Sequence, residues 1–408
     1  MKKLLCFSGL ILLVFSCGPQ HNGNALNEGI WQAELSLTDG KVLPFNFKLY
    51  TSAKGTYQLT ILNAQETIIV DEIEISGDSI RINAPVFDGY IIARFTSKML
   101  EGRFNIESMD RSLPFKATYN ISDRFGQNEP AALNVSGIWE TAFSPDTEDS
   151  YPGKGMFTQK DGKVSGTFRT ASGDYRYLEG VMDNDSLKLS AFDGAHAFLF
   201  LAKTTDSSLN GMFYSGRHFK TPFKAVRNEA FELPNPDSLT FIKQGYDRFD
   251  FSFPDTEDRL VSLSDEMYRN KVVIVQLMGT WCPNCLDETK FLVDYKKSNT
   301  NENLEIVALA FEFAKTKKLA NKSIERLAKR IGVEYPILLA QFGTDNREKA
   351  QEKLPALNHI LSYPTTVFID KKGEVRRIHT GFNGPATGDK YVAFKGDFDR
   401  FVGQLLAE

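Results

Sequence analysis

Two cysteines three residues apart, Cys282 and Cys285, are the side chains whose spacing most directly suggests chemistry. They follow a continuous apolar run at 272–277 and precede a predicted helix that begins near residue 286. Cysteines at this spacing on a first helical turn share one face, so they can close a small disulfide. The positive end of a helix and its free N–H groups lower the pKa of a thiol placed there. We therefore expect Cys282 to be the attacking thiolate and Cys285 the resolving thiol.

Two structural interpretations of the pair compete with a redox interpretation. A disulfide between the cysteines could serve only as a staple, or the two thiols could form half of a zinc site. Zinc would require two further sulfur or imidazole ligands, and the histidines do not cluster at ligand spacing: His21, His196, His218, His359 and His379. Trp281, directly before the pair and at a strand end, favours a redox centre. We accordingly expect neither a metal nor an organic cofactor.

The N-terminus has the features of an export signal. Two lysines precede a mainly apolar stretch at 4–15, which is too short to span a bilayer comfortably as a helix. The next residues complete Val-Phe-Ser-Cys at 14–17, which resembles a bacterial lipobox. We predict a signal peptide at 1–16 and acylation of the Cys17 thiol, which would anchor the mature chain to a membrane. An ordinary cleaved signal and an uncleaved anchor are the alternatives.

The composition of the 408-residue chain narrows its class. A chain of this length, 42% hydrophobic and 25% charged, can form two or three domains that each have a core. Its formal net charge of -4 provides no basic surface to attract phosphates, so nucleic acid is not an expected partner. Cys6 would leave with the signal and Cys17 would carry lipid, so Cys282 and Cys285 would be the remaining thiols. We expect an exported lipoprotein of the bacterial cell envelope that faces the periplasm.

The sequence before the cysteine pair contains an internal repeat. Gly-Ile-Trp at 29–31 recurs at 137–139, and Pro-Phe-Lys-Ala at 114–117 recurs at 222–225, both after 108 residues. Within each copy, short runs alternate apolar and polar residues, which is the period of strands with one wet face. We count about eight strand candidates in each copy, which indicates two antiparallel barrels or sandwiches.

Two paired features of the repeat have structural explanations. Trp31 and Trp139 open the first strand of each copy and are expected to fill the two cores. Phe-Asp-Gly at 87–89 and at 192–194 is typical of strand-end turns, in which glycine adopts a special backbone angle. Neither copy concentrates ionisable groups, so we expect no catalytic role for the repeats. A spacer is the favoured role, ahead of a dimer surface or a substrate-recruiting module.

The remainder of the chain alternates strand and helix patterns. Strand-like runs lie at 272–277, 304–311, 337–340 and 365–369, with a helical face at 324–331 and a closing helix near 398–406. This alternation predicts a sheet with parallel pairs and helices on both faces. The expected organisation is a signal peptide at 1–16, a lipid-anchored tether at 17–27, β-repeats at 28–120 and 134–228, a linker at 229–245 and an α/β domain at 246–408.

The α/β part resembles the TlpA-type branch of thioredoxin-like proteins, which are exported thiol-disulfide oxidoreductases. The resemblance rests on Phe-Ser-Phe-Pro-Asp at 251–255, Val-Ser-Leu-Ser at 261–264, Trp-Cys-Pro-Asn-Cys at 281–285 and Tyr-Pro-Thr at 363–365. It implies a thioredoxin-like fold and a cis bond before Pro364, where the adjacent backbone holds an extended substrate segment. Proline at the head of a strand is also where a cis bond is tolerated. The substrate-binding residues that the resemblance implies are Trp281, Tyr363, Pro364 and Thr365.

The resemblance also implies an acid near the cysteines. Thioredoxins often bury an acid six residues before the first cysteine, where this chain has Gln276. Members of the TlpA-type branch often carry a glutamate at the end of the next strand, and Glu312 follows the run at 304–311. A carboxylate buried there would have a raised pKa and could take the proton of Cys285 during exchange. A solvent-exposed glutamate without a catalytic role is the alternative.

The sequence also predicts roles for two segments that follow Glu312. The stretch 315–335 resembles the extra helical insertion of that family, with its lysines on a solvated face. The Gly-rich segment 381–388 has no lysine after its glycines and opens no phosphate-binding helix, so we reject a nucleotide site there. We expect this segment to border the substrate groove.

These features predict that the chain reduces protein disulfides through a mixed disulfide. Cys282 attacks the substrate, and Cys285 then attacks Cys282 and releases the reduced product. The resemblance implies protein dithiols and disulfides as substrates and a membrane protein as the electron donor. The direction depends on the reduction potential, which Pro-Asn at 283–284 does not determine, so an oxidase or isomerase stays open. The alternative outside the enzymes is a binding protein, namely a lipoprotein that binds a ligand or a protein and uses the thioredoxin-like domain as a scaffold.

Overall fold

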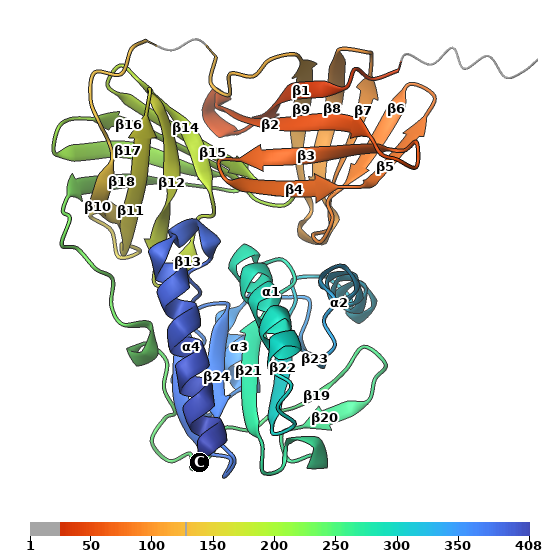
Figure 1. The fold of residues 1–408 in the computed structure, drawn as a ribbon, viewed down its shortest axis with the longest axis vertical. Coiled ribbons are helices and arrows are strands. Elements are labelled where there is room, and N and C mark those ends of the chain that lie inside the picture. Colours follow the sequence, from red (N-terminus) through yellow and green to blue (C-terminus); the bar gives the residue numbers. More distant parts are fainter. Residues whose placement is uncertain (1–24, 127–128) are drawn as a thin grey trace, which may run out of the picture.

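The computed structural model describes residues 25–126 and 129–408. The predicted signal peptide, the acylation site Cys17 and most of the predicted tether lie outside the described residues. Three sheet-based units follow one another along the chain, coloured in Figure 1 from red and orange through yellow and green to blue. The fold class expected from the sequence is confirmed, since two antiparallel β-units precede a thioredoxin-like α/β domain.

The first repeat forms one antiparallel sheet of nine strands. The strands are β1 (Gly29–Ser36), β2 (Val42–Thr51), β3 (Tyr57–Asn63), β4 (Glu66–Val70), β5 (Glu72–Ser76), β6 (Ser79–Asn83), β7 (Gly89–Phe95), β8 (Met99–Ile106) and β9 (Arg111–Tyr119). The order β4-β3-β2-β1-β9-β8-β7-β6-β5 makes β4 and β5 the two edges. Only Asp71 separates these edge strands in the sequence, so the sheet must curl until its edges meet. Because one residue separates β4 from β5, the alternation of apolar and polar residues does not reveal two strands there, which explains the prediction of about eight strands rather than nine.

The second repeat forms a closed barrel. Its strands are β10 (Gly137–Phe143), β11 (Tyr151–Lys160), β12 (Lys163–Thr170), β13 (Gly173–Asp174), β14 (Leu178–Asp183), β15 (Ser186–Phe192), β16 (Ala197–Thr204), β17 (Ser208–Ser215) and β18 (Phe219–Arg227). Strand β11 pairs with both β10 and β12, which closes the ring, and β13 is a two-residue addition to β12. Closure satisfies backbone groups that an open edge would expose.

The two tryptophans of the repeat have equivalent surroundings. Both Trp31 and Trp139 are fully buried, as predicted for core residues. The indole Nε1 of Trp31 donates to the carbonyl oxygen of Asn27 at 3.0 Å, and that of Trp139 donates to Val135 at 2.8 Å. Each ring therefore fills a core while its single donor is satisfied by the chain that enters the first strand.

The Phe-Asp-Gly motifs bring the two repeats together. Phe192 inserts into the core of the first repeat, with its ring centroid 4.3 Å from that of Phe45 and 5.0 Å from that of Phe104. Gly194 has a φ of +94°, as expected for a turn glycine. Gly89 instead begins β7, and a Cβ on it would lie 1.9 Å from the carbonyl oxygen of Gly194. The backbone-angle explanation is wrong for Gly89, because close approach of the two repeats requires glycine there.

The C-terminal domain contains a five-stranded mixed sheet and a short hairpin. Its elements are β19 (Ser252–Pro254), β20 (Leu260–Ser262), β21 (Val272–Met278), β22 (Leu304–Phe311), β23 (Ile337–Gln341), β24 (Thr365–Ile369), β25 (Val375–Thr380), α1 (Pro283–Ser298), α2 (Lys317–Ile331), α3 (Arg347–Lys353) and α4 (Asp389–Ala407). The sheet order is β23-β22-β21-β24-β25, with β21, β22 and β23 parallel and the other two strands antiparallel. The predicted parallel pairs are therefore present.

Apolar side chains pack on both faces of this sheet. Helices α1, α2 and α4 contribute to the core on one face, and α3 with the segment 249–268 contributes to the other. Strand β25 escapes sequence prediction because it carries Arg376, Arg377 and His379, and an edge strand can remain polar. Within residues 25–126 and 129–408, no helix is both long and apolar enough to cross a membrane.

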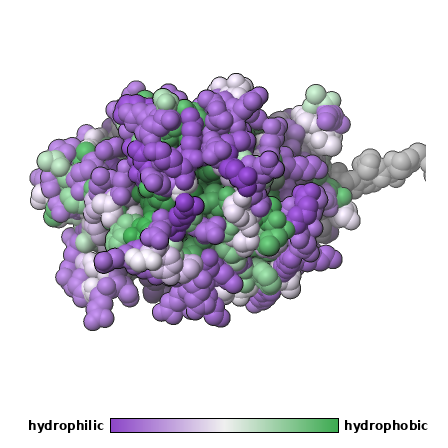
Figure 2. All heavy atoms as spheres, turned by 90° about the horizontal axis from the view of Figure 1, so that it is seen from below, coloured by the Kyte–Doolittle hydropathy of each residue, from purple (hydrophilic) through white to green (hydrophobic). Residues whose placement is uncertain are grey.

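The β-repeats lie side by side over the end of the α/β domain at which α1 begins (Figure 1). The opposite end of the domain, seen from below in Figure 2, is largely hydrophilic with apolar patches between polar side chains. The β-repeats therefore meet the α/β domain at the end that carries the cysteine pair.

Candidate active site

The cysteine pair lies between the end of β21 and the first turn of α1. A disulfide joins Cys282 to Cys285, whose Cα atoms are 5.2 Å apart. Cys282 is the N-cap residue of α1, and its Sγ accepts a hydrogen bond from the backbone N–H of Cys285 at 3.1 Å. Pro283 takes the first helical position, where its missing N–H costs no intrahelical bond. When the disulfide is reduced, the helix N-terminus favours negative charge on the Cys282 sulfur.

A second segment, at the start of β24, faces Cys282. The Tyr363–Pro364 peptide bond is cis, in agreement with what the resemblance implies. The carbonyl oxygen of Tyr363 lies 3.4 Å from Cys282 Sγ. The hydroxyl of Thr365 donates to the carbonyl oxygen of Ser362 at 2.9 Å, which ties together the two sides of the cis bond. A backbone carbonyl therefore lies beside the sulfur that is expected to attack.

Trp281 borders the pair on another side. Its ring stacks on Phe313 at 3.9 Å between centroids and lies edge to face with Tyr363 at 5.8 Å. Its Nε1 donates to the carbonyl oxygen of Phe311 at 2.9 Å. These contacts hold a half-buried indole next to Cys282. Trp281 and Tyr363 thus lie beside the Cys282 sulfur, and Pro364 and Thr365 follow directly on the chain from Tyr363.

Glu312 is buried directly after β22, with only 2% of its surface exposed. The alternative of a solvent-exposed strand-end glutamate is therefore wrong. Its carboxylate accepts hydrogen bonds from the N–H of Thr280 at 2.8 Å and from the Thr280 hydroxyl at 2.6 Å. Burial raises the pKa of Glu312 to about 7, and the bonds from Thr280 offset only part of this rise. Both hydrogen bonds hold the loop that leads into Trp281 and Cys282.

A second buried acid, Glu288, lies on α1 itself and is not among the site residues predicted from the sequence. It is 1% exposed and accepts hydrogen bonds from Gln276 Nε2 at 2.9 Å and from the Thr366 hydroxyl at 2.7 Å. Gln276 Nε2 also lies 3.4 Å from the carbonyl oxygen of Cys285. Burial raises the pKa of Glu288 to about 7 despite these bonds. Its spacing of three residues after Cys285 is the signal that could have found it, because such residues share a helix face.

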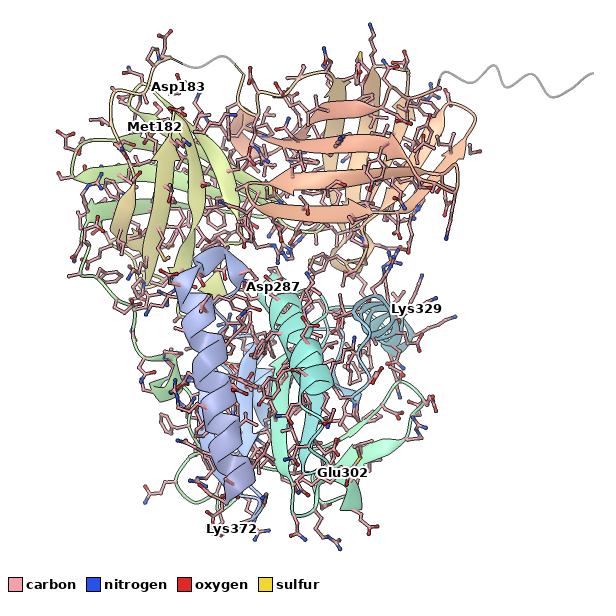
Figure 3. The ribbon with its side chains drawn as sticks, in the orientation of Figure 1. Met182, Asp183, Asp287, Glu302, Lys329 and Lys372 are labelled. Carbon is pink, nitrogen blue, oxygen red and sulfur yellow. A yellow bond between two sulfur atoms is a disulfide. The ribbon has the colours of Figure 1, made fainter. Side chains whose placement is uncertain are left out.

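The fold brings a charged cluster to the first turn of α1, although neither repeat concentrates ionisable groups in sequence. Arg176 of the second repeat donates to Asp287 Oδ2 at 3.1 Å and to the carbonyl oxygen of Pro283 at 3.4 Å. It also pairs with Glu66 of the first repeat and with Asp193. Figure 3 shows Asp287 at the end of α1 that faces the β-repeats. One buried guanidinium therefore joins both repeats to the helix that carries the cysteines.

Comparisons with known proteins identify the chemistry of the α/β domain. The AhpC/TSA family matches residues 245–378. The thiol-disulfide oxidoreductase ResA of Geobacillus kaustophilus (strain HTA426) is 31% identical over 142 residues, which are 35% of this chain and 72% of that protein. The chain belongs to the thioredoxin-like thiol-disulfide oxidoreductases.

Similarity to other known proteins also covers less than half of this oxidoreductase. The thioredoxin-like protein YneN of Bacillus subtilis (strain 168) is 28% identical over 140 residues, 34% of this chain and 73% of that protein. The solved structure of a thiol:disulfide interchange protein of the thioredoxin family from Chlorobium tepidum TLS covers 43% of the oxidoreductase and 99% of its own chain, with 21% identity and a TM-score of 0.29. The family match begins at residue 245, so the β-repeats of the oxidoreductase lie outside it.

Proposed function

We propose that this oxidoreductase is exported to the periplasm-facing cell envelope, tethered to a membrane by a lipid on Cys17, and reduces disulfides of other proteins. The observation that carries the redox part is the 3.4 Å separation between Cys282 Sγ and the carbonyl oxygen of Tyr363. It supports a substrate held as an extended segment beside cis-Pro364, with its disulfide next to the attacking sulfur. The exchange moves electrons between sulfur atoms and so requires no metal or organic cofactor.

In the first step, the Cys282 thiolate attacks one sulfur of the substrate disulfide. A bond forms between Cys282 Sγ and that sulfur while the substrate S–S bond breaks, and the leaving sulfur departs as a thiolate that takes a proton from solvent. The N–H of Cys285, 3.1 Å from Cys282 Sγ, and the N-terminus of α1 stabilise the thiolate before the attack. The product of this step is a mixed disulfide.

In the second step, Cys285 loses its proton and attacks Cys282 Sγ, so the substrate leaves as its second thiolate. Glu288 is the best-placed proton acceptor, because Gln276 Nε2 contacts both its carboxylate and the backbone of Cys285. A carboxyl group with a pKa of about 7 can accept and return a proton at neutral pH. The step ends with the disulfide between the two cysteines.

We assign Glu312 a positioning role. The resemblance makes it the expected proton acceptor, but its two hydrogen bonds go to Thr280, two residues before Cys282. A carboxyl that holds this loop keeps Trp281 and the attacking sulfur in place. The acid that shares a hydrogen-bond donor with Cys285 is Glu288.

The resemblance to the TlpA-type branch supports reduction as the direction of exchange. In this direction, a membrane protein that passes electrons outward returns the Cys282–Cys285 disulfide to its dithiol form. An oxidase or isomerase would use the same atoms and would differ in reduction potential. A binding lipoprotein would lose no function when both thiols are removed.

The equilibrium reduction potential of the cysteine pair tests this proposal. It is measured in the full chain by titration against glutathione, with Cys282→Ser as the blank. A value near that of thioredoxin, about -270 mV, would support a reductant, whereas about -120 mV would overturn that direction in favour of a disulfide donor. If the two cysteines form no internal disulfide, the redox role is refuted and the alternative of a binding lipoprotein is favoured.

A further inference from the structure

A loop of the second repeat lies on the side of the cysteine pair where substrate is expected. The hydroxyl of Ser362, two residues before Pro364, donates to the carbonyl oxygen of Ser172 at 3.3 Å. Gly173 follows with a φ of +134°, and a Cβ on it would lie 2.1 Å from Nδ2 of Asn284. Asn284 stands between the two cysteines. The backbone of this loop therefore covers the surface between the Cys-Pro-Asn-Cys turn and the cis-proline strand.

Two buried side chains fasten the loop to the α/β domain. Asp174 Oδ2 accepts a hydrogen bond from the N–H of Gly384 at 2.7 Å, within the Gly-rich segment expected to border the substrate groove. Arg176 donates to Asp287 and to the carbonyl oxygen of Pro283. These contacts reach both the helix that carries the cysteines and the loop beside it. They favour a role for the repeats at the active site over the role of a spacer.

The first repeat covers another side of the cysteine pair. Val86 packs against the core cluster that contains Cys282 and Cys285. Val86 and Phe87 also line a small cavity whose opposite wall includes Trp281. The loop before β7 thus lies across this cavity from the indole that borders the attacking sulfur.

Ion pairs between the first repeat and α2 complete this contact. Arg330 binds Asp71 at 2.9 Å and also binds Glu72, and Arg326 binds Glu72 at 2.9 Å. All of these side chains are partly exposed. They can therefore be exchanged without disturbing an apolar core, in contrast to the buried Arg176.

Beneath these loops Cys282 is 4% exposed and Cys285 is fully buried. Attack by a thiolate requires the substrate disulfide in line with the Cys282 sulfur, and a folded partner cannot reach that position while both loops cover it. We propose that the two β-repeats form a cap that inhibits the oxidoreductase by occupying its substrate groove. Protein disulfides react when this cap separates from the α/β domain. The inference rests on the proposed function.

The contact between the cap and the α/β domain combines polar contacts with one small apolar cluster. Arg176, Asp174 and Arg330 supply ion pairs and hydrogen bonds, and Ala84 and Phe87 of the first repeat pack against Leu286 of α1. Phe192 joins the two repeats through a larger apolar core. Polar contacts are exchanged for contacts with water when an interface opens, and polar interfaces between domains commonly allow relative motion. The two repeats therefore separate from the α/β domain as one unit.

Alkylation of Cys282 in the full, reduced chain tests the cap. Iodoacetamide serves as a small probe and a maleimide that carries polyethylene glycol as a bulky one. Fragmentation mass spectrometry of the peptide that contains both Cys282 and Cys285 separates the labelling of the two thiols. The rate is measured for the folded chain and for the same chain unfolded in urea.

Two variants open the cap, and one variant controls for charge. Arg330→Glu repels the carboxylates of Asp71 and Glu72, and Arg176→Ala removes the buried contact to α1. Lys329→Glu makes the same change of charge at an exposed neighbouring residue on α2, which is labelled in Figure 3. Hydrogen exchange of residues 171–176 reports separation of the cap independently of the thiols.

We expect both opening variants to raise hydrogen exchange at 171–176 and to raise bulky labelling of Cys282 on the order of tenfold, with Lys329→Glu near wild type. Faster exchange with unchanged labelling would overturn the cap, as would wild-type labelling as fast in the folded chain as in urea. Unchanged exchange in both variants would also overturn it, since these contacts would then not hold the repeats in place. Labelling that responds to the variants, without reduction of any protein disulfide, would instead refute the proposed function.

Discussion

Gln276 Nε2 donates a hydrogen bond of 2.9 Å to Glu288 Oε2 next to the redox disulfide. Gln276 stands at the position, six residues before Cys282, where thioredoxins often bury an acid. Here the acid comes from α1 instead, three residues after Cys285, so one helical turn carries both groups. The arrangement keeps an ionisable carboxyl close to the resolving cysteine while β21 remains uncharged.

Cys285→Ser should trap the mixed disulfide. Without a resolving thiol, Cys282 can attack a substrate disulfide but cannot release the product, so covalent adducts should accumulate. Incubation of the reduced variant with insulin, followed by a non-reducing gel, measures them. The matched variant Cys282→Ser should form none, and adducts in that variant alone would reverse the assigned roles.

Glu288→Gln should slow the resolving step about 100-fold at neutral pH, the usual effect of removing a general base. The amide can still accept the hydrogen bond from Gln276 but cannot take a proton. Stopped-flow decay of the mixed disulfide measures the step, while the initial attack by Cys282 should be unchanged. Glu302→Gln makes the same change at the exposed far end of the domain, labelled in Figure 3, and should have no effect. A larger loss in Glu312→Gln would move the proton acceptor to Glu312.

The stability of the protein should depend on pH through Glu288. Burial raises the pKa of Glu288 to about 7 from an ordinary value of 4.5, so the folded protein binds this proton more tightly than the unfolded chain. The contribution to stability is fully present at low pH and is lost as pH rises through about 7, by about 3 kcal/mol. Relative to wild type, the free energy of unfolding of Glu288→Gln should therefore rise with pH.

Urea denaturation across this pH range measures that difference. Subtracting wild type from the variant at each pH cancels the titration of carboxyls that both proteins share. A difference that stays constant from acid to weakly alkaline pH would show that the pKa of Glu288 is not raised in the folded protein.

Phe192→Ala should destabilise the two β-repeats together. The ring fills the core of the first repeat from the second, so its removal should cost about 3–5 kcal/mol of unfolding free energy in the β-unit. Phe219→Ala, at an exposed position on β18, should cost less than about 1 kcal/mol. Thermal unfolding followed by tryptophan fluorescence in a Trp281→Phe background, which leaves only Trp31 and Trp139, reports both repeats. Equal losses in the two variants would contradict the insertion of Phe192.

Local patterns predict much of this fold because they record which face of each element is buried. The run at 272–277 is buried on both faces and becomes the central strand β21, and the repeated Gly-Ile-Trp begins two equivalent strands. The pattern fails at β25, where an edge strand needs few apolar residues, and at Gly89, where the constraint is a carbonyl 105 residues away in the other repeat.

The amino-acid sequence by itself determined where the redox chemistry resides. The two cysteines are only three residues apart, so the local geometry of one helical turn is enough to bring them together. Tertiary structure decided which acid serves them and what covers them. Folding places Glu288 beside Gln276 and Glu312 beside Thr280. It also brings Arg176 into contact with Asp287, which is 111 residues further along the chain. A local period cannot encode such pairs, because the fold creates the low-dielectric surroundings that raise the pKa values of Glu288 and Glu312 and make a charged partner necessary for Arg176.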